Sequence, residues 1–323
     1  MPEFVVTAIS KHESINMKFF CTSDWHLRAT TPKNRIDDFS AELFRKVDWI
    51  YNMAYHNQCS YILRAGDLTN SATLPYSVTQ KYIDLFLSWK EKEVIGIDIA
   101  GQHDMRYHSN DLENTPIMTF AAAKSIILLG RGDMFEPEEG IHIYGAGWND
   151  DIPEIEDPEA FNILIIHSMM ISEKIWYGQE NYDSARKFLK DNNFDLIVSG
   201  DNHKTVVSCV SHINGDKWLL NTGSLMRQKS DQMDHKPCIF IFDTETRKSD
   251  IHYIPCKDIS QVMNIEKISK EKEQSKELND LKEKLNENVE ESGLDYLLNL
   301  RLGLSTSGLS EKAIEFVERS IPA

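Results

Sequence analysis

The feature that most constrains this fold is a series of short apolar runs that each end in a polar turn. The runs are rich in β-branched and aromatic residues, and they are MKFFCTSDWH (17–26), SYILRAGD (60–67), VIGIDIAGQHD (94–104), FNILIIHS (161–168), FDLIVSGDNH (194–203) and KWLLNTGS (217–224). Runs of this length and composition, bounded by turn residues, predict buried β-strands. Each predicted strand would therefore deliver polar side chains at its carboxyl end.

Segments of helix length separate the early runs. In 37–57 and 76–93, apolar residues recur three and four positions apart, which is the spacing of an amphipathic helix. Strands that alternate with helices predict an α/β fold. After His203 the pattern changes to closely spaced runs at 205–210, 217–223, 238–246 and 249–255. We therefore expect the second half of the core to be rich in strands.

The charge balance limits how the chain meets an anionic partner. With 35 Lys plus Arg against 51 Asp plus Glu, the net charge of -16 argues against coating nucleic acid or a membrane through the overall field. An anionic substrate must be held locally. The five cysteines are scattered without a CxxC pair, and no segment resembles a signal peptide or a membrane span. These features predict a cytoplasmic protein that does not associate with membranes.

The composition shifts near Cys256 and suggests a second unit. Residues 266–291 are dominated by Glu, Lys and Asn with a thin apolar stripe, which predicts a polar, solvent-facing helix. A strand at 296–304 and a closing helix at 309–321 are expected to follow. The predicted organisation is an extension at 1–16, a main domain at 17–256 and a small α+β unit at 257–323.

Polar residues with metal-binding or acid-base chemistry gather at the predicted strand ends. Each group alone is weak evidence, because single histidines and aspartates are common in turns. Adjacent parallel strands would bring the groups to one edge of a sheet, where open α/β sheets bind ligands. The groups are Asp24 with His26, then Asp67, Gln102 with His103, His167, and Asp201 with His203.

The chemistry of this set predicts a pair of metal ions. Carboxylates, imidazoles and an amide oxygen without sulfur suit manganese, iron or zinc, and the share of oxygen favours manganese. Seven candidate ligands are too many for one tetrahedral zinc ion and suit two ions with a shared bridge. Asp67 is the expected bridge, because the preceding Gly66 lets the backbone turn sharply.

These motifs carry a resemblance to a known family. DWH, GDLTN, GQHD, IIHS and GDNH, in this order, resemble the calcineurin-like metallophosphoesterase superfamily, whose pattern is DxH, GDxxD, GNHD or GNHE, a lone His, and GHxH. The resemblance implies a metallophosphoesterase β-sandwich flanked by helices, here with a small C-terminal α+β capping unit. It also implies a hydrolase that cleaves phosphodiesters with two divalent ions.

Within the superfamily, further features look most like the SbcD-type nucleases of bacteria and bacteriophages. They are DWHL, the NTGSL turn at 221–225 and the appended C-terminal unit. This resemblance implies an exonuclease or endonuclease subunit that acts on DNA ends in repair and recombination. The implied partners are DNA, an SbcC-type SMC-like ATPase and a second copy of the chain.

Carried over residue by residue, the resemblance implies two metal sites and one acid. The first ion would be held by Asp24, His26, Asp67 and His203. The second would be held by Asp67, Gln102, His167 and Asp201. His103 would be the catalytic acid that protonates the departing sugar oxygen.

Three positions depart from the family pattern. Gln102 stands where the family usually has Asn, and Asp201 stands where it has the first His of GHxH. Both changes fall on the second ion and give it a harder, more negative shell, which favours manganese or magnesium. Asn70 stands where relatives often have Asp or His, so an amide would orient His103 and raise its pKa less. Asp104 is expected either to orient a neighbouring group or simply to form the turn.

A basic residue follows each of four site loops. Lys and Arg are the usual partners of a phosphate backbone, although exposed loops also carry them for solubility. The four candidates for substrate phosphate are Arg28, Arg106, Lys204 and Arg227.

Three functions remain open at this level. The leading hypothesis is a two-metal DNA nuclease. The second is a phosphoesterase of the same fold that acts on a small molecule, such as a cyclic nucleotide, or on a phosphoprotein. The third is a weakly active or inactive scaffold that keeps the fold, which the departures at Gln102, Asp201 and Asn70 would allow.

Overall fold

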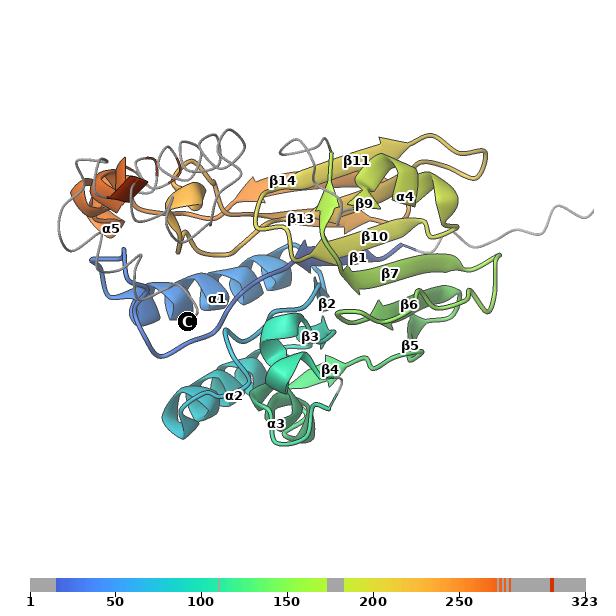
Figure 1. Ribbon diagram of the computed structural model, residues 1–323. Coiled ribbons are helices and arrows are strands. Elements are labelled where there is room, and N and C mark those ends of the chain that lie inside the picture. The colour runs from blue at the N-terminus through green and yellow to red at the C-terminus, as the bar shows by residue number, and fades with distance from the viewer. Residues whose placement is uncertain are drawn as a thin grey trace, which may run out of the picture. The chain divides into compact units, whose positions relative to one another are not determined.

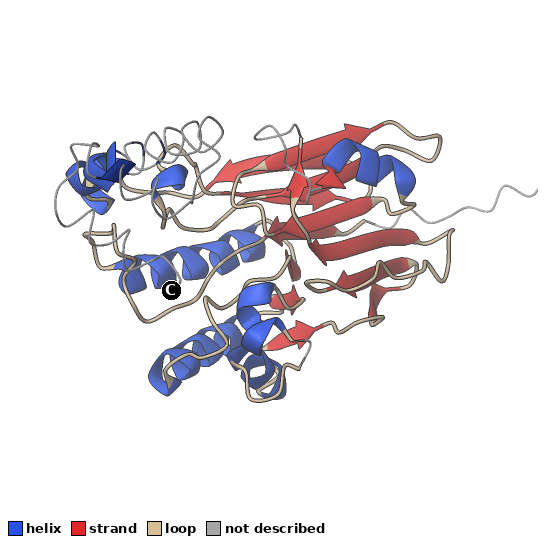
Figure 2. Ribbon diagram, viewed as in Figure 1, coloured by secondary structure: helices blue, strands red, loops and turns tan. Residues whose placement is uncertain are grey.

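The computed structural model describes residues 16–109, 111–172, 183–271, 273–274, 276, 279 and 303–304. The chain divides between Val262 and Met263 into two compact units. All the motifs discussed above belong to the first unit, which is built around two mixed β-sheets (Figures 1 and 2).

The first sheet has the strand order β14-β13-β1-β2-β3-β4. Strands β1 to β4 run parallel to one another, β13 is antiparallel to β1, and β14 is antiparallel to β13. The strands are β1 (Lys18–Thr22), β2 (Tyr61–Arg64), β3 (Ile95–Asp98), β4 (Ile126–Leu128), β13 (Cys238–Asp243) and β14 (Lys248–Tyr253).

The second sheet also has parallel strands inside, but it has an antiparallel strand at each of its two edges. Its order is β11-β12-β10-β7-β6-β5. The strands are β5 (Met134–Glu138), β6 (Ile141–Ala146), β7 (Phe161–His167), β10 (Leu196–Gly200), β11 (Val206–Val210) and β12 (Lys217–Asn221). The short strands β8 (Met170–Ile171) and β9 (Asp183–Ser184) pair with each other.

Helices cover the outer faces of the sheets. Three helices pack on the first sheet: α1 (Phe39–His56), α2 (Tyr76–Lys90) and α3 (Pro116–Ala122). Helix α4 (Ala185–Asp191) packs on the second sheet. Helix α1 begins after Asp38, whose side chain accepts a hydrogen bond from the backbone N–H of Ala41, as expected of an N-cap. A short helix, α5, spans Ile259–Val262. Among the described residues, no helix combines the length and the hydrophobicity that crossing a bilayer would require.

The core forms three apolar layers because strand residues alternate between the two faces of a sheet. In β1, Phe19 and Cys21 belong to the cluster between the two sheets, whereas Phe20 belongs to the cluster beneath the helices. In β7, Ile163 and Ile165 point between the sheets, and their neighbours pack with α4. The unit is therefore a β-sandwich flanked by helices, which confirms the predicted fold class.

The strands and helices predicted for residues 17–256 are present. The six apolar runs contain β1, β2, β3, β7, β10 and β12, and the two amphipathic segments contain α1 and α2. The second half of the core is strand-rich, as predicted. Strands β4, β5, β6, β8 and β9 and helices α3, α4 and α5 were not predicted.

The structure describes only part of the C-terminal segment for which the sequence predicts a helix, a strand and a second helix. Residues 265–271 are helical. Of the predicted strand at 296–304, only Gly303 and Leu304 are described, and both are helical, so the strand prediction is wrong at these two positions. The extension at 1–15 and the predicted helix at 309–321 lie outside the described residues. The domain boundaries at 16 and 256 stay predictions.

Candidate functional site

The predicted site residues meet at the carboxyl ends of five parallel strands. Strands β1, β2 and β3 of the first sheet lead to Asp24 and His26, to Asp67, and to Gln102 and His103. Strand β7 of the second sheet ends at His167, and β10 leads to Asp201 and His203. Both sheets therefore contribute to one site, which neither sheet could form alone.

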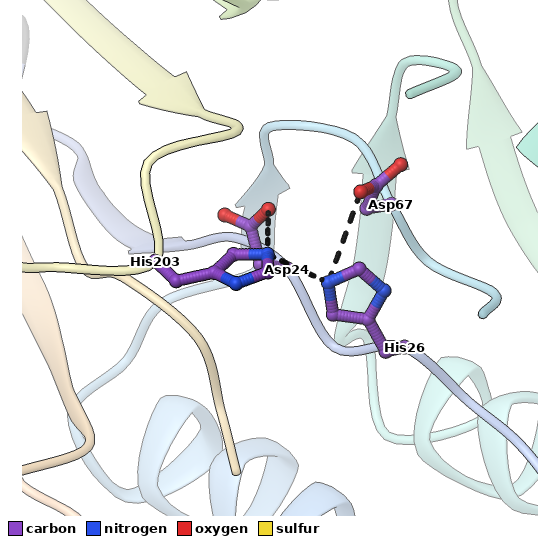
Figure 3. Close-up of side chains that lie close together, drawn as sticks. All are labelled: Asp24, His26, Asp67 and His203. Carbon is purple, nitrogen blue, oxygen red and sulfur yellow. Dashed lines mark hydrogen bonds and ion pairs between the residues drawn. The ribbon is translucent and has the colours of Figure 1, made fainter. Parts of the chain in front are cut away.

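Four of these residues, here called the first-ion group, converge most closely (Figure 3). One ligand atom from each lies within 4.8 Å of the others, and the members are Asp24, His26, Asp67 and His203. The Nε2 atoms of His26 and His203 are 3.0 Å apart. His26 Nε2 lies 3.7 Å from Asp67 Oδ2, and His203 Nε2 lies 3.7 Å from Asp24 Oδ1. This is the set that the resemblance assigned to one ion.

The first-ion group fits a divalent cation. Asp24 and Asp67 are fully buried, and one carboxylate oxygen of each, Oδ2, has no hydrogen-bond partner in the described part of the chain. Buried oxygens without partners are costly, and a cation between them would remove that cost. The donor set of two carboxylates and two imidazoles matches ions such as manganese, iron and zinc.

Burial also sets the charge state of the group. It raises the pKa of Asp24 to about 7, and it raises the pKa of Asp67 far above its usual range with help from the nearby Asp104 carboxylate. Burial lowers the pKa of His203 to about 4 and lowers the pKa of His26 well below its usual value. The imidazoles are therefore neutral at pH 7, which is the form that binds metals.

The backbone is strained where it presents these side chains. Asp24, His26, Asp67 and Asp201 have φ angles of 51°, 50°, 51° and 73°, in the left-handed region that L-residues rarely adopt. Each such residue costs about 1–3 kcal/mol and persists only when the surroundings hold it in place. A hydrogen bond of 2.9 Å from the N–H of His26 to the carbonyl of Asp67 is one such restraint.

The other predicted ligands, here called the second-ion group, are Gln102, His167 and Asp201. His167 Nδ1 donates to the carbonyl of Ala65 over 2.7 Å, so its Nε2 lone pair faces Gln102 Oε1 at 2.6 Å. The other end of the amide, Gln102 Nε2, donates to Asp201 Oδ1 over 2.8 Å. His167 Nε2 is also 3.6 Å from Asp67 Oδ1, which places Asp67 between the two groups as the predicted bridge.

The Gln102 amide thus forms a bridge between His167 and Asp201. In this orientation a lone pair of His167 faces an acceptor oxygen, and in the reversed orientation the amide oxygen would face the Asp201 carboxylate. Either orientation leaves two acceptors in contact, and a cation between them would relieve this. The donor set therefore fits a second ion, although the amide bridge must open to admit it.

Two glycines allow the loops to approach this closely. A Cβ on Gly66, which has φ of +80°, would lie 2.3 Å from His167 Nδ1. A Cβ on Gly101 would lie 2.2 Å from Asp67 Oδ1. Gly66 therefore serves the sharp turn expected from the sequence, and it also leaves room for His167.

His103 stands beside Asp67 at the accessible side of the site. Its side chain is 43% exposed, and its Nε2 is 3.9 Å from Asp67 Oδ2. The ring is hydrogen-bonded to the backbone of Asn70, and the amide oxygen of Asn70 instead accepts from Arg28 Nη1 over 3.1 Å. The predicted contact with the Asn70 amide is thus made by a different part of that residue. Partial burial lowers the pKa of His103.

Asp104 connects the loops that follow β2 and β3. Its buried carboxylate accepts hydrogen bonds from the backbone N–H groups of Leu68, Thr69 and Gly101. The contacts span 2.7 to 3.2 Å. Asp104 therefore fixes the spacing between the loop of Asp67 and the loop of His103, which is an orienting role.

A cavity of about 550 Å³ opens next to His103, here called the His103 cavity. It is lined by His26, His103 and His203 together with 28, 32–34, 70 and 228–232. Of the four candidate phosphate-binding residues, Arg28 lines it and the others do not. Arg106 donates to the carbonyl of Asn114, and Arg227 is buried and donates to the carbonyl of Lys257. Lys204 is exposed outside this cavity.

Sequence reasoning missed two residues of the site, Lys229 and Gln232. Gln232 is buried, and its Nε2 lies 3.0 Å from His203 Nδ1. Its Oε1 accepts from the backbone N–H groups of Gln228 and Lys229 over 2.7 and 3.0 Å. No motif in 228–232 marks these positions, which follow the NTGSL turn and lie at a single-turn 3-10 helix, η3 (Ser230–Gln232).

Comparison with known proteins agrees with the geometry. A family model described as calcineurin-like phosphoesterase matches residues 17–205, a span that begins before Asp24 and ends after His203. No curated protein matches the chain. The matched span is more than half of the 323 residues, and it contains every member of both ion groups. The family acts on phosphoesters, and the site described above is a candidate binuclear metal centre of the kind that such hydrolysis uses. This chain belongs to the calcineurin-like phosphoesterase family.

Proposed function

We propose that this chain is a metal-dependent phosphodiesterase that cleaves DNA, as an exonuclease or endonuclease subunit. The observation that carries the proposal is the His103 cavity of about 550 Å³ beside the first-ion group. Pockets for ligands of nucleotide size commonly measure about 300–1,000 Å³, so this cavity has room for a leaving group much larger than water. A phosphodiester with a nucleotide on that side suits it.

The side chains divide the work of hydrolysis. A bound pair of divalent ions, with manganese the best match to the donor set, supplies positive charge for the phosphate oxygens and lowers the pKa of the attacking water. Asp67 lies between the two ion groups and is the residue that would be shared. His103, exposed toward the cavity, would give a proton to the departing oxygen.

The position of the NTGSL turn supports a nuclease of the SbcD type. Its Leu225 N–H donates to the carbonyl of Asp24 over 3.2 Å, and its Ser224 N–H donates to the carbonyl of His203 over 3.2 Å. The turn therefore braces both loops of the first-ion group. By the same resemblance, the chain would act on DNA ends in repair and recombination, with the segment from 257 onward docking an SMC-like ATPase and with two copies per complex.

Two substrates test the proposal. With Mn²⁺ present, the purified chain should release nucleotides from duplex DNA ends and should hydrolyse bis(4-nitrophenyl) phosphate, and an SMC-like ATPase should increase the first rate. His103→Ala should abolish hydrolysis while elemental analysis shows unchanged metal content. Full activity of His103→Ala would remove that residue from its role, and cleavage of the dye ester alone, with no effect of the ATPase, would refute the nuclease.

One observation favours a phosphodiesterase of small molecules instead. The net charge of -16 opposes binding of a long polyanion at sites away from the cavity. Under that alternative a cyclic nucleotide would be hydrolysed and duplex DNA would not. The amide bridge of Gln102 favours a third possibility, a scaffold in which the second ion does not bind, and such a chain would hydrolyse neither substrate.

A further inference from the structure

The His103 cavity is positively charged in an acidic protein. Its ionisable lining residues other than histidines are Arg28, Lys33, Lys229 and Asp231, whereas the whole chain carries a net charge of -16. A local excess of cationic side chains beside a buried acidic metal centre suggests that the cavity binds an anion. The cations stand where the leaving group of a phosphodiester would lie, because His103 borders the same cavity.

Lys229 is the cavity residue whose charge is the most available to a ligand. Its side chain makes no hydrogen bond or ion pair with the part of the chain that the structure describes, although its backbone N–H is held by Gln232. It lines the same cavity as the rings of His26, His103 and His203. Gln232 also contacts His203, which fixes the segment of Lys229 against the first-ion group.

Arg28 is held in place without being neutralised. Its guanidinium donates to Asn70 Oδ1 over 3.1 Å, to Gln228 Oε1 over 3.2 Å and to the hydroxyl of Thr30. All of these acceptors are uncharged, and Arg28 has no carboxylate partner within the described residues. A guanidinium oriented by neutral groups keeps its charge available for an anion.

A second cavity, on the side of the second-ion group, has the opposite character. It measures about 400 Å³, and the described residues that line it include no lysine or arginine. The lining includes Trp148, Phe188, Asp150 and Asp151 together with His167 and Asp201. The two cavities flank the metal centre, and only the one with the proposed acid offers cations.

We propose that the His103 cavity binds a second phosphate group, carried by the leaving group of the substrate, and that Lys229 and Arg28 are its ligands. This inference rests on the proposed phosphodiesterase function and deepens it by naming the substrate class. The preferred substrate is a phosphodiester whose departing alcohol bears a further phosphate, as in a nucleotide chain. A phosphate on the other substituent, which faces the second cavity, is not required.

Three substrates test this directly in the metal-loaded full chain. They are a thymidine dinucleotide without terminal phosphate, its 5′-phosphorylated form and its 3′-phosphorylated form. Product analysis shows which nucleoside departs. A terminal phosphate should raise kcat/KM about tenfold when it is on the departing nucleoside, because charge-assisted hydrogen bonds are the strong ones. On the retained nucleoside it should have little effect.

Matched lysine variants assign the effect to the cavity. Lys229→Met should abolish the preference for the phosphorylated leaving group, and Lys229→Arg should keep most of it. Lys236→Met should keep all of it, because Lys236 is exposed and does not line the cavity. Metal content, measured on each variant, should equal that of the unaltered chain.

The possible failures are distinct. Equal kcat/KM for all three dinucleotides, a preference for phosphate on the retained nucleoside, or an unchanged preference in Lys229→Met would overturn the inference and leave the phosphodiesterase standing. No hydrolysis of any dinucleotide or of a simple dye diester would overturn the proposed function itself.

Discussion

The two ion groups meet at Asp67 but differ in which contacts their ligand atoms make with one another. In the first-ion group, carboxylate oxygens of Asp24 and Asp67 are buried without partners. In the second-ion group, the Gln102 amide joins His167 to Asp201. Each group is thus bridged by a side-chain contact, which joins two neutral imidazoles, His26 and His203, in the first group and an amide to a carboxylate in the second.

This difference predicts unequal affinities. The second ion must displace the hydrogen bond from Gln102 to the Asp201 carboxylate, and hydrogen bonds to charged groups contribute about 1.5–3 kcal/mol each. Since about 1.4 kcal/mol corresponds to a factor of ten, we expect the second ion to bind about tenfold or more weakly than the first. The departures from the family pattern at Gln102 and Asp201 would be the cause.

The largest effect is expected from breaking the first-ion group. Asp24→Asn removes a ligand that belongs to this group alone, and it should lower kcat for the dye diester by more than about 100-fold, since even outer partners of metal ligands matter by 10–100-fold. Metal analysis should show loss of one ion. Asp216→Asn, an exposed carboxylate in the turn between β11 and β12, is the control and should behave like the unaltered chain. Comparable activity in the two variants would contradict the assignment.

A shorter amide at position 102 tests the second-ion group. The side chain of Gln102→Asn is too short to span from His167 to Asp201. The hydrogen bond to the Asp201 carboxylate would no longer compete with the metal, so the affinity of the second-ion group for Mn²⁺ should rise about tenfold. Affinity for the first ion should not change. Weaker binding of the second ion would show that the glutamine is a necessary ligand and not a barrier.

The affinity of the first-ion group should depend on pH. Burial raises the pKa of Asp24 to about 7 in the metal-free protein, so a cation must displace a proton below that pH. His26 and His203 have lowered pKa values and stay neutral through this range. Binding of Mn²⁺ should therefore strengthen from pH 6 to pH 8, by about tenfold per pH unit for each proton displaced. Constant affinity over this range would mean that Asp24 is already ionised.

The smallest effect is on the stability of the metal-free protein. The pKa values of Asp24 and Asp67 are raised by burial, so above the unfolded value the unfolded chain has lost protons that the folded chain retains. Stability then falls as pH rises. The lowered pKa values of His26 and His203 act in the opposite direction, but only below about pH 6.5.

Between about pH 6.5 and 8, only the aspartates among the members of the first-ion group should still contribute. The unfolding temperature of the metal-free protein should drop by about 3 °C or more over this interval. The metal-loaded protein should show no such drop, because the ions hold both carboxylates ionised. An unfolding temperature that rises with pH in the metal-free protein would contradict the direction of these shifts.

Much of the site could be predicted because its ligands come directly after short buried strands in the sequence. Asp24, Asp67, His167 and His203 lie within a few residues of a strand end, and parallel strands bring such ends together. The amide bridge could not be predicted, since it depends on the reach of one side chain from β3 in one sheet to Asp201 after β10 in the other. Alternation of apolar and polar residues carries no such information.

The unpredicted parts share a physical reason. Lys229 and Gln232 lie at the single turn of η3, whose path is set by hydrogen bonds to its own backbone, and one turn is too short to leave a periodic pattern. Strand β5, Met134–Glu138, is an edge strand with a bulge and contains a proline, so its pattern is broken. The contact of His103 with the backbone of Asn70, in place of its side chain, likewise depends on loop geometry.

The most direct test is an equilibrium titration of the metal-free chain with Mn²⁺ by calorimetry, near pH 8 where Asp24 is largely ionised. We predict two ions per chain in two separate steps, with the tighter step lost in Asp24→Asn and the weaker step strengthened in Gln102→Asn. A single step, no binding at all, or loss of only the weaker step in Asp24→Asn would contradict the division of the centre into a tighter and a weaker site.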